Sequence, residues 1–438
     1  MRRSVSPQRD ADVAQASPPN DKNDWEAESW AADSVATVTA LPVKEFVPPL
    51  AEVSRTPLDD YRGGGRLAEF PSPWRHPFRA IAWAARAAFG IVSLIVLLAL
   101  LAAIPIVNFL VLGYLLEAEG GVARGGRLRR AFPLLSIAPR LGSIVLGIWL
   151  WLLPLRFLAN VAADARLIDP TSRSTRRLDF AVTALSIAIA LHLCLALARG
   201  GSVGCFLRPI KNARWALRQW RLGGYADKAA AEIRAFVAGL RLRYHFWLGV
   251  RGAFGAFAWL VVPTALFAFA SKTEGKQIVV TILGGFLLVP VLAWLPFLQA
   301  RFASENRFRG LFELREVRRL FSHAPFAWLL AVVATYVLAL PLYLLKIFLL
   351  PQDAMWFVTL VFILSIYPAR LVTGWAYGRA LRREQRAGFL WRWSARLLLG
   401  PLLLVYVFLL FFTQFIGQHG KGVLFEHHAF LVPAPFWL

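Results

Sequence analysis

The chain has 438 residues, of which 58% are hydrophobic, and its formal net charge is +23. A mean hydropathy of +0.53, carried by eight long apolar stretches, excludes an ordinary soluble globular protein. The two cysteines, Cys194 and Cys205, are too few for a disulfide framework and do not have the spacing of a metal site.

The first part of the chain differs from the rest in composition. Residues 1–70 are rich in Pro, Ser, Asp, Glu and Ala and show little periodicity. Residues 1–86 carry 11 Lys and Arg against 12 Asp and Glu, so the whole positive charge belongs to residues 87–438. We predict a disordered tail over 1–70, because such a composition buries too little apolar surface to fold. The transmembrane domain should then cover 71–438, with 71–86 as an interfacial lead-in that alternates aromatic side chains with arginine.

Eight apolar runs occupy the rest of the chain, each long enough for a helix that crosses the ~30 Å hydrocarbon layer. They lie near 88–116, 141–163, 179–204, 246–270, 278–300, 325–350, 354–377 and 397–417. The expected fold is therefore all-α, a polytopic transmembrane helical bundle of seven or eight spans with basic interfacial amphipathic segments and internal repeats.

The first run leaves the number of crossings open. It is the longest run, Pro105 divides it, and both of its flanks are basic. The charge favours a re-entrant hairpin of two half-helices, 88–104 and 106–116, which gives seven crossings and a cytoplasmic N-terminus. The length also allows one tilted span, which gives eight crossings.

Arginine and lysine are distributed unevenly between the runs. Together, 26 of them lie in four segments, 117–140, 205–245, 301–324 and 378–396. Only 7 lie in the other four, 164–178, 271–277, 351–353 and 418–438. Because cytoplasmic loops retain Lys and Arg, the first group should face the cytoplasm and the C-terminus should be extracytoplasmic, in the cell (inner) membrane. The expected partners are the lipid bilayer and anionic lipids at its cytoplasmic face, and no nucleic acid is expected, because topology accounts for the charge.

The chain also repeats itself. An Arg-Gly pair begins nineteen residues after Pro105 and again nineteen residues after Pro290, and a weaker copy begins at Pro368. Each unit consists of a span with a proline near its middle or end, a basic amphipathic segment, and the next span. These are parallel repeats, which occur in transporters and also arise by duplication in scaffolds.

Several motifs within 75–438 resemble an uncharacterised bacterial multi-pass membrane family, a domain of unknown function marked by a proline followed by Gly-Tyr. They are GYLLEAEGGVAR, LRLRYHFWLGVRG, LPFLQARFASENRFRGLFELREVRRLF, LPLYLLKI, PARLVTGWAYGRA and LFEHHAFLVPAPF. The resemblance implies an integral membrane protein and transfers no catalytic or binding residue.

Arg156 is the polar residue most difficult to explain within a span. Asn160 and Asp164 follow it at four and eight residues, which places the three on one helix face. The set could line a cavity, or Arg156 could snorkel to the interface beside Asp164. Mid-span His192 could relay protons or bind a ligand, and the more ordinary interpretation is a neutral histidine hydrogen-bonded across a helix interface.

Other polar residues suggest less. Snorkelling accounts for Arg251 and Arg370, which lie one to two turns from the cytoplasmic edge. Glu117 and Glu119 are two residues apart, so they should face different sides of a helix and pair with nearby arginines rather than act as acid and base. The triplet 426–428, Glu-His-His, is the most metal-like cluster, but adjacent ligands would need a loop and further partners, and we predict no metal.

No nucleotide, nucleophile-elbow or redox motif is found, so we expect neither an enzyme nor a cofactor and no catalytic residue. The favoured function is non-enzymatic organisation of membrane lipid or partner proteins. The alternatives are a transporter or channel with a polar path near Arg156, and an intramembrane or lipid-modifying enzyme. The candidate intramembrane polar site is Arg156, Asn160, Asp164 and His192.

Overall fold

A computed structural model describes residues 74–125, 131–223, 225–268, 276–347 and 355–416, together with Leu424 and Leu431. All of them belong to the compact unit Thr56–Leu438. The tail predicted over 1–70 and the triplet 426–428 lie outside the described residues, and those two predictions stay untested.

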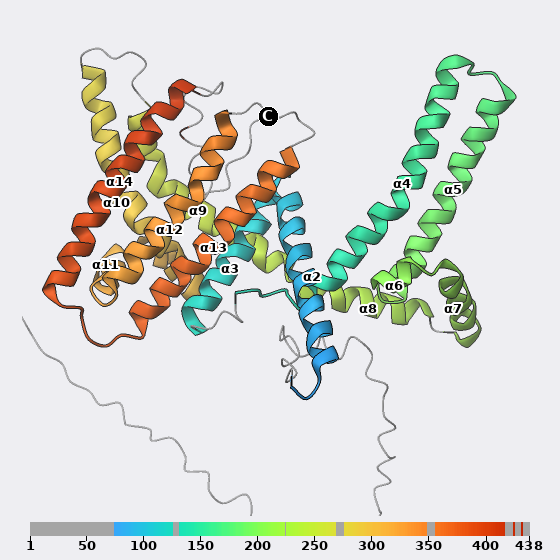
Figure 1. Cartoon of the computed structure of the whole chain (residues 1–438), viewed down its shortest axis with the longest axis horizontal. Coiled ribbons are helices and arrows are strands. Elements are labelled where there is room, and N and C mark those ends of the chain that lie inside the picture. The colour runs from blue at the N-terminus through green and yellow to red at the C-terminus, as the bar shows by residue number, and fades with distance from the viewer. Residues whose placement is uncertain are drawn as a thin grey trace, which may run out of the picture. The chain divides into compact units, whose positions relative to one another are not determined.

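The described part of the chain is helical throughout, as predicted (Figure 1). The helices in chain order are α2 (Pro77–Ala102), α3 (Asn108–Gly125), α4 (Ala138–Ile168), α5 (Arg173–Ala198), α6 (Val203–Phe206), α7 (Pro209–Leu222), α8 (Tyr225–Leu240), α9 (Leu242–Phe267), α10 (Lys276–Glu305), the 3-10 helix η2 (Phe308–Phe312), α11 (Leu314–Phe321), α12 (Pro325–Ile347), α13 (Met355–Leu381) and α14 (Phe389–Ile416). Eight of them are long and apolar enough to cross a membrane, namely α2, α4, α5, α9 together with the end of α8, α10, α12, α13 and α14. The chain is a multi-pass membrane protein of helical bundle type.

The first apolar run forms two helices and not one tilted span. α2 ends at Ala102 and α3 begins at Asn108, with a turn between them in which Ile106 has a φ of 70°. Pro105 lies in this turn, where its missing N–H removes a helical hydrogen bond. α3 then returns beside α2 (Figure 1), so the division at Pro105 that the hairpin alternative requires is confirmed.

α3 is the central helix of the bundle. It packs against α9, α10 and α13, and 13 of its 18 residues are buried. α12 and α14 extend the core beyond α13 and α10, around the fully buried Trp328. By contrast, only four of the 31 residues of α4 are buried, although most of α4 is apolar. In a membrane those exposed apolar faces of α4 would meet lipid rather than water.

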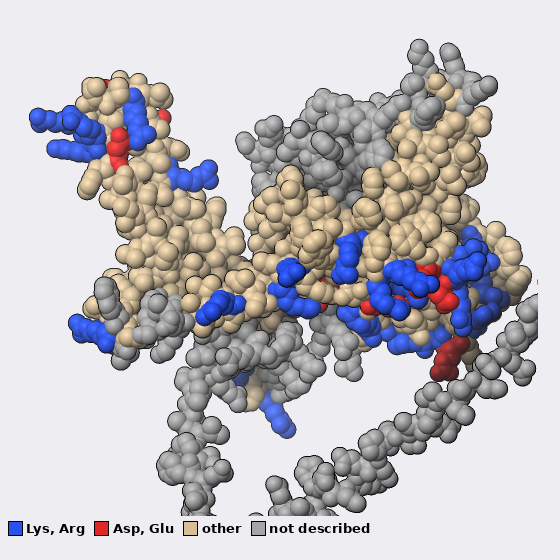
Figure 2. Space-filling view, turned by 180° about the vertical axis from the view of Figure 1, so that it is seen from behind, with Lys and Arg blue, Asp and Glu red and all other residues tan. Residues whose placement is uncertain are grey.

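The four arginine-rich segments gather at one end of these helices. Arg124 at the end of α3 donates to the carbonyl of Ser304 at the end of α10, over 2.8 Å. Arg241, just before α9, reaches Glu117, and Arg382 after α13 reaches the carbonyl of Ala123. Figure 2 shows the resulting band of Lys and Arg, with carboxylates among them. We call this surface the basic belt; its described arginines lie in 124–140, 208–243, 301–319 and 379–396.

Candidate functional site

Glycine allows α3 and α9 to touch backbone to backbone. A Cβ on Gly113 would lie 1.7 Å from the carbonyl oxygen of His245, and a Cβ on Gly249 would lie 1.8 Å from that of Phe109. Any other residue at either position would separate the helices, which explains why small residues occur at helix crossings in membranes. Gly252 and Gly255, three residues apart on α9, face the side chains of neighbouring helices and not a backbone.

Two further helices approach α3 in the same way. Gly120 of α3 faces the carbonyl of Ala303 on α10, where an added Cβ would be 2.3 Å away. Gly374 of α13 faces the carbonyl of Glu119, where an added Cβ would be 2.4 Å away. α3 is therefore enclosed by α9, α10 and α13, whose backbones touch its own, and most of its side chains are buried among these helices.

A charged pair lies inside this enclosure. Arg370 of α13 donates from Nη1 to Glu119 Oε2 over 3.1 Å and to Gln299 Oε1 of α10 over 2.8 Å. Arg370 is 4% exposed, and Glu119 and Gln299 are 0% exposed. We call these three residues the buried polar centre. Glu119 lies on α3, after Pro105, Gln299 lies on α10 after Pro290, and Arg370 lies on α13 after Pro368. Each of the three repeats therefore contributes one residue to the buried polar centre.

The expectation that Arg370 snorkels to the interface is wrong. Its guanidinium is buried and bound to a carboxylate, since Glu119 and Gln299 offer acceptors within reach and the surrounding helices exclude water. Gln299 completes the arrangement, because its Nε2 donates to the carbonyl of Leu431 over 2.8 Å while its Oε1 accepts from Arg370. Among the described residues, Glu119 Oε1 has no hydrogen-bond partner.

Glu117 faces the other side of α3, as the two-residue spacing predicted. Its Oε1 accepts from Arg241 over 3.0 Å, and its Oε2 lies 3.3 Å from Nδ1 of His245, which is buried. Both glutamates pair with arginines, as expected. The arginines, however, are 124 and 251 residues away along the chain, just before α9 and on α13.

A short hydrogen-bonded chain of tyrosines adjoins this site. Tyr367 donates to the carbonyl of Ala131 over 2.8 Å, and the hydroxyls of Tyr114 and Tyr367 are 3.0 Å apart. Because Tyr367 has a single hydroxyl proton, Tyr114 must be the donor in their mutual bond. These hydrogen bonds join α3 and α13 to the segment before α4.

The structure does not join Arg156 to His192. Arg156, Asn160 and Asp164 lie on an exposed face of α4. Trp151 faces His192, with their ring centres 4.6 Å apart, and Arg156 is five residues further on, about 140° around the helix. Arg156, Asn160 and Asp164 therefore lie on the surface of α4. α4 and α5 form no cavity that these residues share with His192.

His192 is held as a structural histidine. Its Nε2 lies 3.0 Å from the carbonyl oxygen of Phe206 in α6, to which Trp151 Nε1 also donates over 2.9 Å. Since a carbonyl can only accept, Nε2 of His192 must carry a proton. This hydrogen bond across the interface of α5 and α6 is the contact that the ordinary interpretation of His192 requires.

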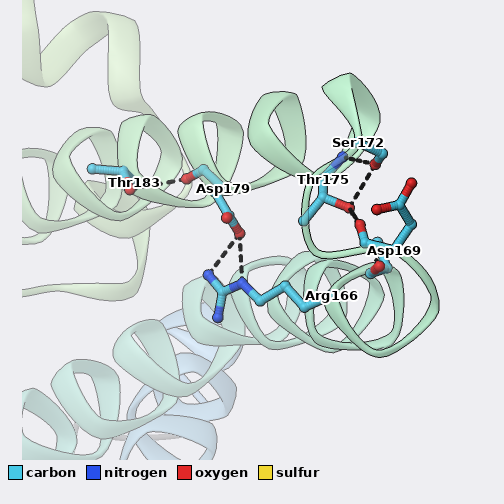
Figure 3. Close-up of polar contacts among 7 residues, drawn as sticks. Arg166, Asp169, Ser172, Thr175, Asp179 and Thr183 are labelled. Carbon is cyan, nitrogen blue, oxygen red and sulfur yellow. Dashed lines mark hydrogen bonds and ion pairs between the residues drawn. The ribbon is translucent and has the colours of Figure 1, made fainter.

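The turn between α4 and α5 is tied by polar side chains (Figure 3). Ser172 caps α5 by accepting from the backbone N–H of Thr175 over 3.0 Å, and Arg166 pairs with Asp179. The backbone N–H and hydroxyl of Thr171 both donate to Asp169, which lowers the pKa of that carboxyl. These contacts fix the end of the hairpin opposite to the basic belt.

Chemically, the buried polar centre joins helices, and Glu119 Oε1 is its acceptor without a partner among the residues that the structure describes. Among the described residues, no group of three His, Cys, Asp or Glu side chains is placed to hold a metal ion. No family model, no curated protein and no solved structure matches the chain, so the resemblance to the Pro…Gly-Tyr family stays a prediction.

Proposed function

We propose that this protein is a non-enzymatic organiser of the cell (inner) membrane, which gathers anionic phospholipids at its cytoplasmic face. The basic belt is the cytoplasmic end of the bundle, the turn between α4 and α5 is extracytoplasmic, and the C-terminus is extracytoplasmic. Partner proteins that bind the same lipid-rich zone are a further part of this proposal.

The observation that carries the proposal is the convergence of four distant arginine-rich segments on one end of the helices. Topology signalling requires only that these segments remain on one side. The belt goes further, because contacts such as Arg124 to Ser304 and Arg241 to Glu117 hold the segments side by side as one surface. A continuous cationic surface at the leaflet attracts anionic headgroups by about 1 kcal/mol per side chain.

Lipid analysis of the purified protein tests the function. Protein extracted in mild detergent should retain more anionic than zwitterionic phospholipid, relative to the membrane from which it was taken. High salt should reduce the excess, because exposed charges are screened over about 10 Å at 0.1 M salt. Retained lipid of the same composition as the bulk membrane would overturn the proposal.

Cysteine labelling tests the orientation. Cys194 and Cys205 are first replaced, and a single cysteine is placed at Arg309, whose side chain is 90% exposed on the belt. An impermeant reagent added to intact cells should leave this cysteine unmodified and should modify one at Thr171, in the turn between α4 and α5. Labelling of the Arg309 position from outside would reverse the topology.

Transport is a second candidate, favoured by Glu119 Oε1, which is buried without a partner among the described residues. Ionisable groups inside a membrane are often parts of ion or proton paths. The path would then run through the buried polar centre and not along Arg156. A proton conductance in proteoliposomes that Glu119→Gln abolishes would establish it, and an equal conductance with both proteins would exclude it.

A further inference from the structure

A groove of about 590 Å³ opens at the belt, between the ends of α12, α13 and α14. Its size is that of a small-molecule or headgroup site. Its walls combine two arginines, two tryptophans and aliphatic side chains. The lining residues are Ala324, Pro325, Phe326, Ala327, Leu330, Trp375, Arg379, Arg383, Ala387, Gly388 and Trp391.

The charge in the groove is positive, and the part of the chain that the structure describes supplies no counter-charge to it. None of the described residues that line it is acidic. In the described part of the chain, no ion pair with a carboxylate is formed by Arg379 or Arg383, whereas belt arginines such as Arg301 and Arg307 pair with glutamate. Arg383 makes only a 3.3 Å bond to the carbonyl of His323, so most of its guanidinium donors remain for a ligand.

Arg379 is oriented by an aromatic wall of the groove. The guanidinium of Arg379 lies over the ring of Trp375, with Cζ 5.6 Å from the centroid. Such stacking orients the planar cation while leaving its edge, with the N–H donors, free. The first turn of α12 also lines the groove, and its backbone N–H groups add positive potential to that of the arginines.

The opposite wall is apolar and exposed. Trp391 is 60% exposed and Leu330 is 53% exposed, and the ring of Phe326 lies 4.8 Å from that of Trp391. Leu330 is more than one turn inside α12, toward the apolar part of the span. A ligand that fills this groove therefore needs an anionic end at the belt and a hydrocarbon part that follows α12 into the membrane.

We propose that the groove binds one anionic glycerophospholipid, with its phosphate on Arg379 and Arg383 and an acyl chain against Phe326 and Leu330. The proposal rests on the lipid-organising function and gives it one specific site. The apolar wall argues for lipid as the source of the phosphate, because a soluble phosphate would make no use of it. Tryptophan at the level of the headgroups is common at membrane interfaces.

The test uses full-length protein, with phosphatidylglycerol and phosphatidylcholine as probes and native mass spectrometry to count retained lipids. The variant Arg379→Gln/Arg383→Gln removes both groove charges. The matched control, Arg173→Gln/Arg177→Gln, removes two exposed charges from the start of α5, at the end of the helices opposite to the belt. The groove variant should bind phosphatidylglycerol about thirtyfold more weakly than wild type, since each arginine near the leaflet contributes about a factor of five.

Each outcome decides the proposal. One phosphatidylglycerol retained by wild type and by the α5 control, and lost from the groove variant, supports it. Arg379→Lys/Arg383→Lys should restore part of the binding, which separates a loss of charge from a loss of fold. Equal retention of phosphatidylglycerol by the groove variant and the control would overturn the groove site and leave the proposed function of the belt intact. A wild type that shows no preference for phosphatidylglycerol over phosphatidylcholine would overturn the groove site and the function of the belt together. Displacement of the lipid by inorganic phosphate at equal concentration would show a soluble ligand and would also overturn the proposal.

Discussion

Removal of Arg370 should destabilise the protein severely. In the variant Arg370→Met, Glu119 keeps a buried carboxylate with no cation, which costs about 3–5 kcal/mol by comparison with other broken buried pairs. Gln299 Oε1 also loses its donor, and an unsatisfied buried acceptor adds about 1–3 kcal/mol. The expected loss, about 4–8 kcal/mol, is a large part of the roughly 5–15 kcal/mol that stabilises a typical protein.

The double variant Glu119→Leu/Arg370→Met separates the charge from the packing. It removes both charges and keeps similar volumes, and such replacements are often neutral or stabilising by about 1–4 kcal/mol. We expect it to be within about 2 kcal/mol of wild type, with the amide of Gln299 as the remaining cost. With the second single variant, Glu119→Leu, the coupling energy of the pair is the change in stability of the double variant minus the sum of the changes in the two single variants.

Unfolding of the purified protein by increasing SDS in mild detergent, followed by circular dichroism, measures these differences. The control Arg318→Gln on the belt should change stability by no more than about 0.5 kcal/mol. If Arg370→Met unfolds at the same SDS concentration as the control, the ion pair of Arg370 and Glu119 is not held in a dry interior. If the double variant is as unstable as the single one, the cost lies in lost packing and the electrostatic reasoning is refuted.

Three other features of the fold can be tested by single substitutions. Gly113→Ala should prevent α3 from reaching α9 and abolish the folded peak in size-exclusion chromatography, whereas Gly400→Ala, where an added Cβ meets no atom within 4 Å, should be neutral or stabilising by up to about 1 kcal/mol. Ser172→Ala removes the cap of α5 and should lower stability by about 1 kcal/mol in the same SDS titration, and a change near zero would show that the Ser172 cap carries no weight. Arg156→Leu should insert more readily, by about 2.5–3.5 kcal/mol on insertion scales, and an inserted but inactive variant in a phenotypic assay would show that the exposed stripe serves a partner.

The spans could be predicted because length and hydropathy decide them almost alone. The hairpin alternative predicted a separate helix after Pro105 but ended it at residue 116, whereas α3 runs to Gly125. Its central position could not be recognised, because α3 continues an apolar run and Glu117 and Glu119 make its second half look like a loop. The turn at 103–107 was suggested only by Pro105 and by the charge of the flanks. A stronger signal was present in the glycines of α3, since small residues at helical spacing mark close contacts.

The buried polar centre was beyond the reach of sequence reasoning. Spacing rules relate residues three or four apart on one helix, and they say nothing about Arg370 and Glu119, which are 251 residues apart. The same limit affected Arg156. Its alignment with Asn160 and Asp164 on one face was correct, but apolar residues occupy all the rest of α4, so no pattern indicated which part would turn toward the other helices.

The separation of Glu119 and Arg370 along the sequence also sets the order in which this chain can fold. At a synthesis rate of about 5–20 residues per second, 251 residues take roughly 13–50 seconds. During that time the first helices are already at the membrane, and Glu119 has neither its cation nor the helices that will enclose it. The nascent amino-terminal hairpin is therefore an incomplete product that must be kept from degradation and from wrong pairing until α13 arrives. Any chain that terminates before Arg370 should be recognised by quality control as unfinished, however well its earlier spans have inserted.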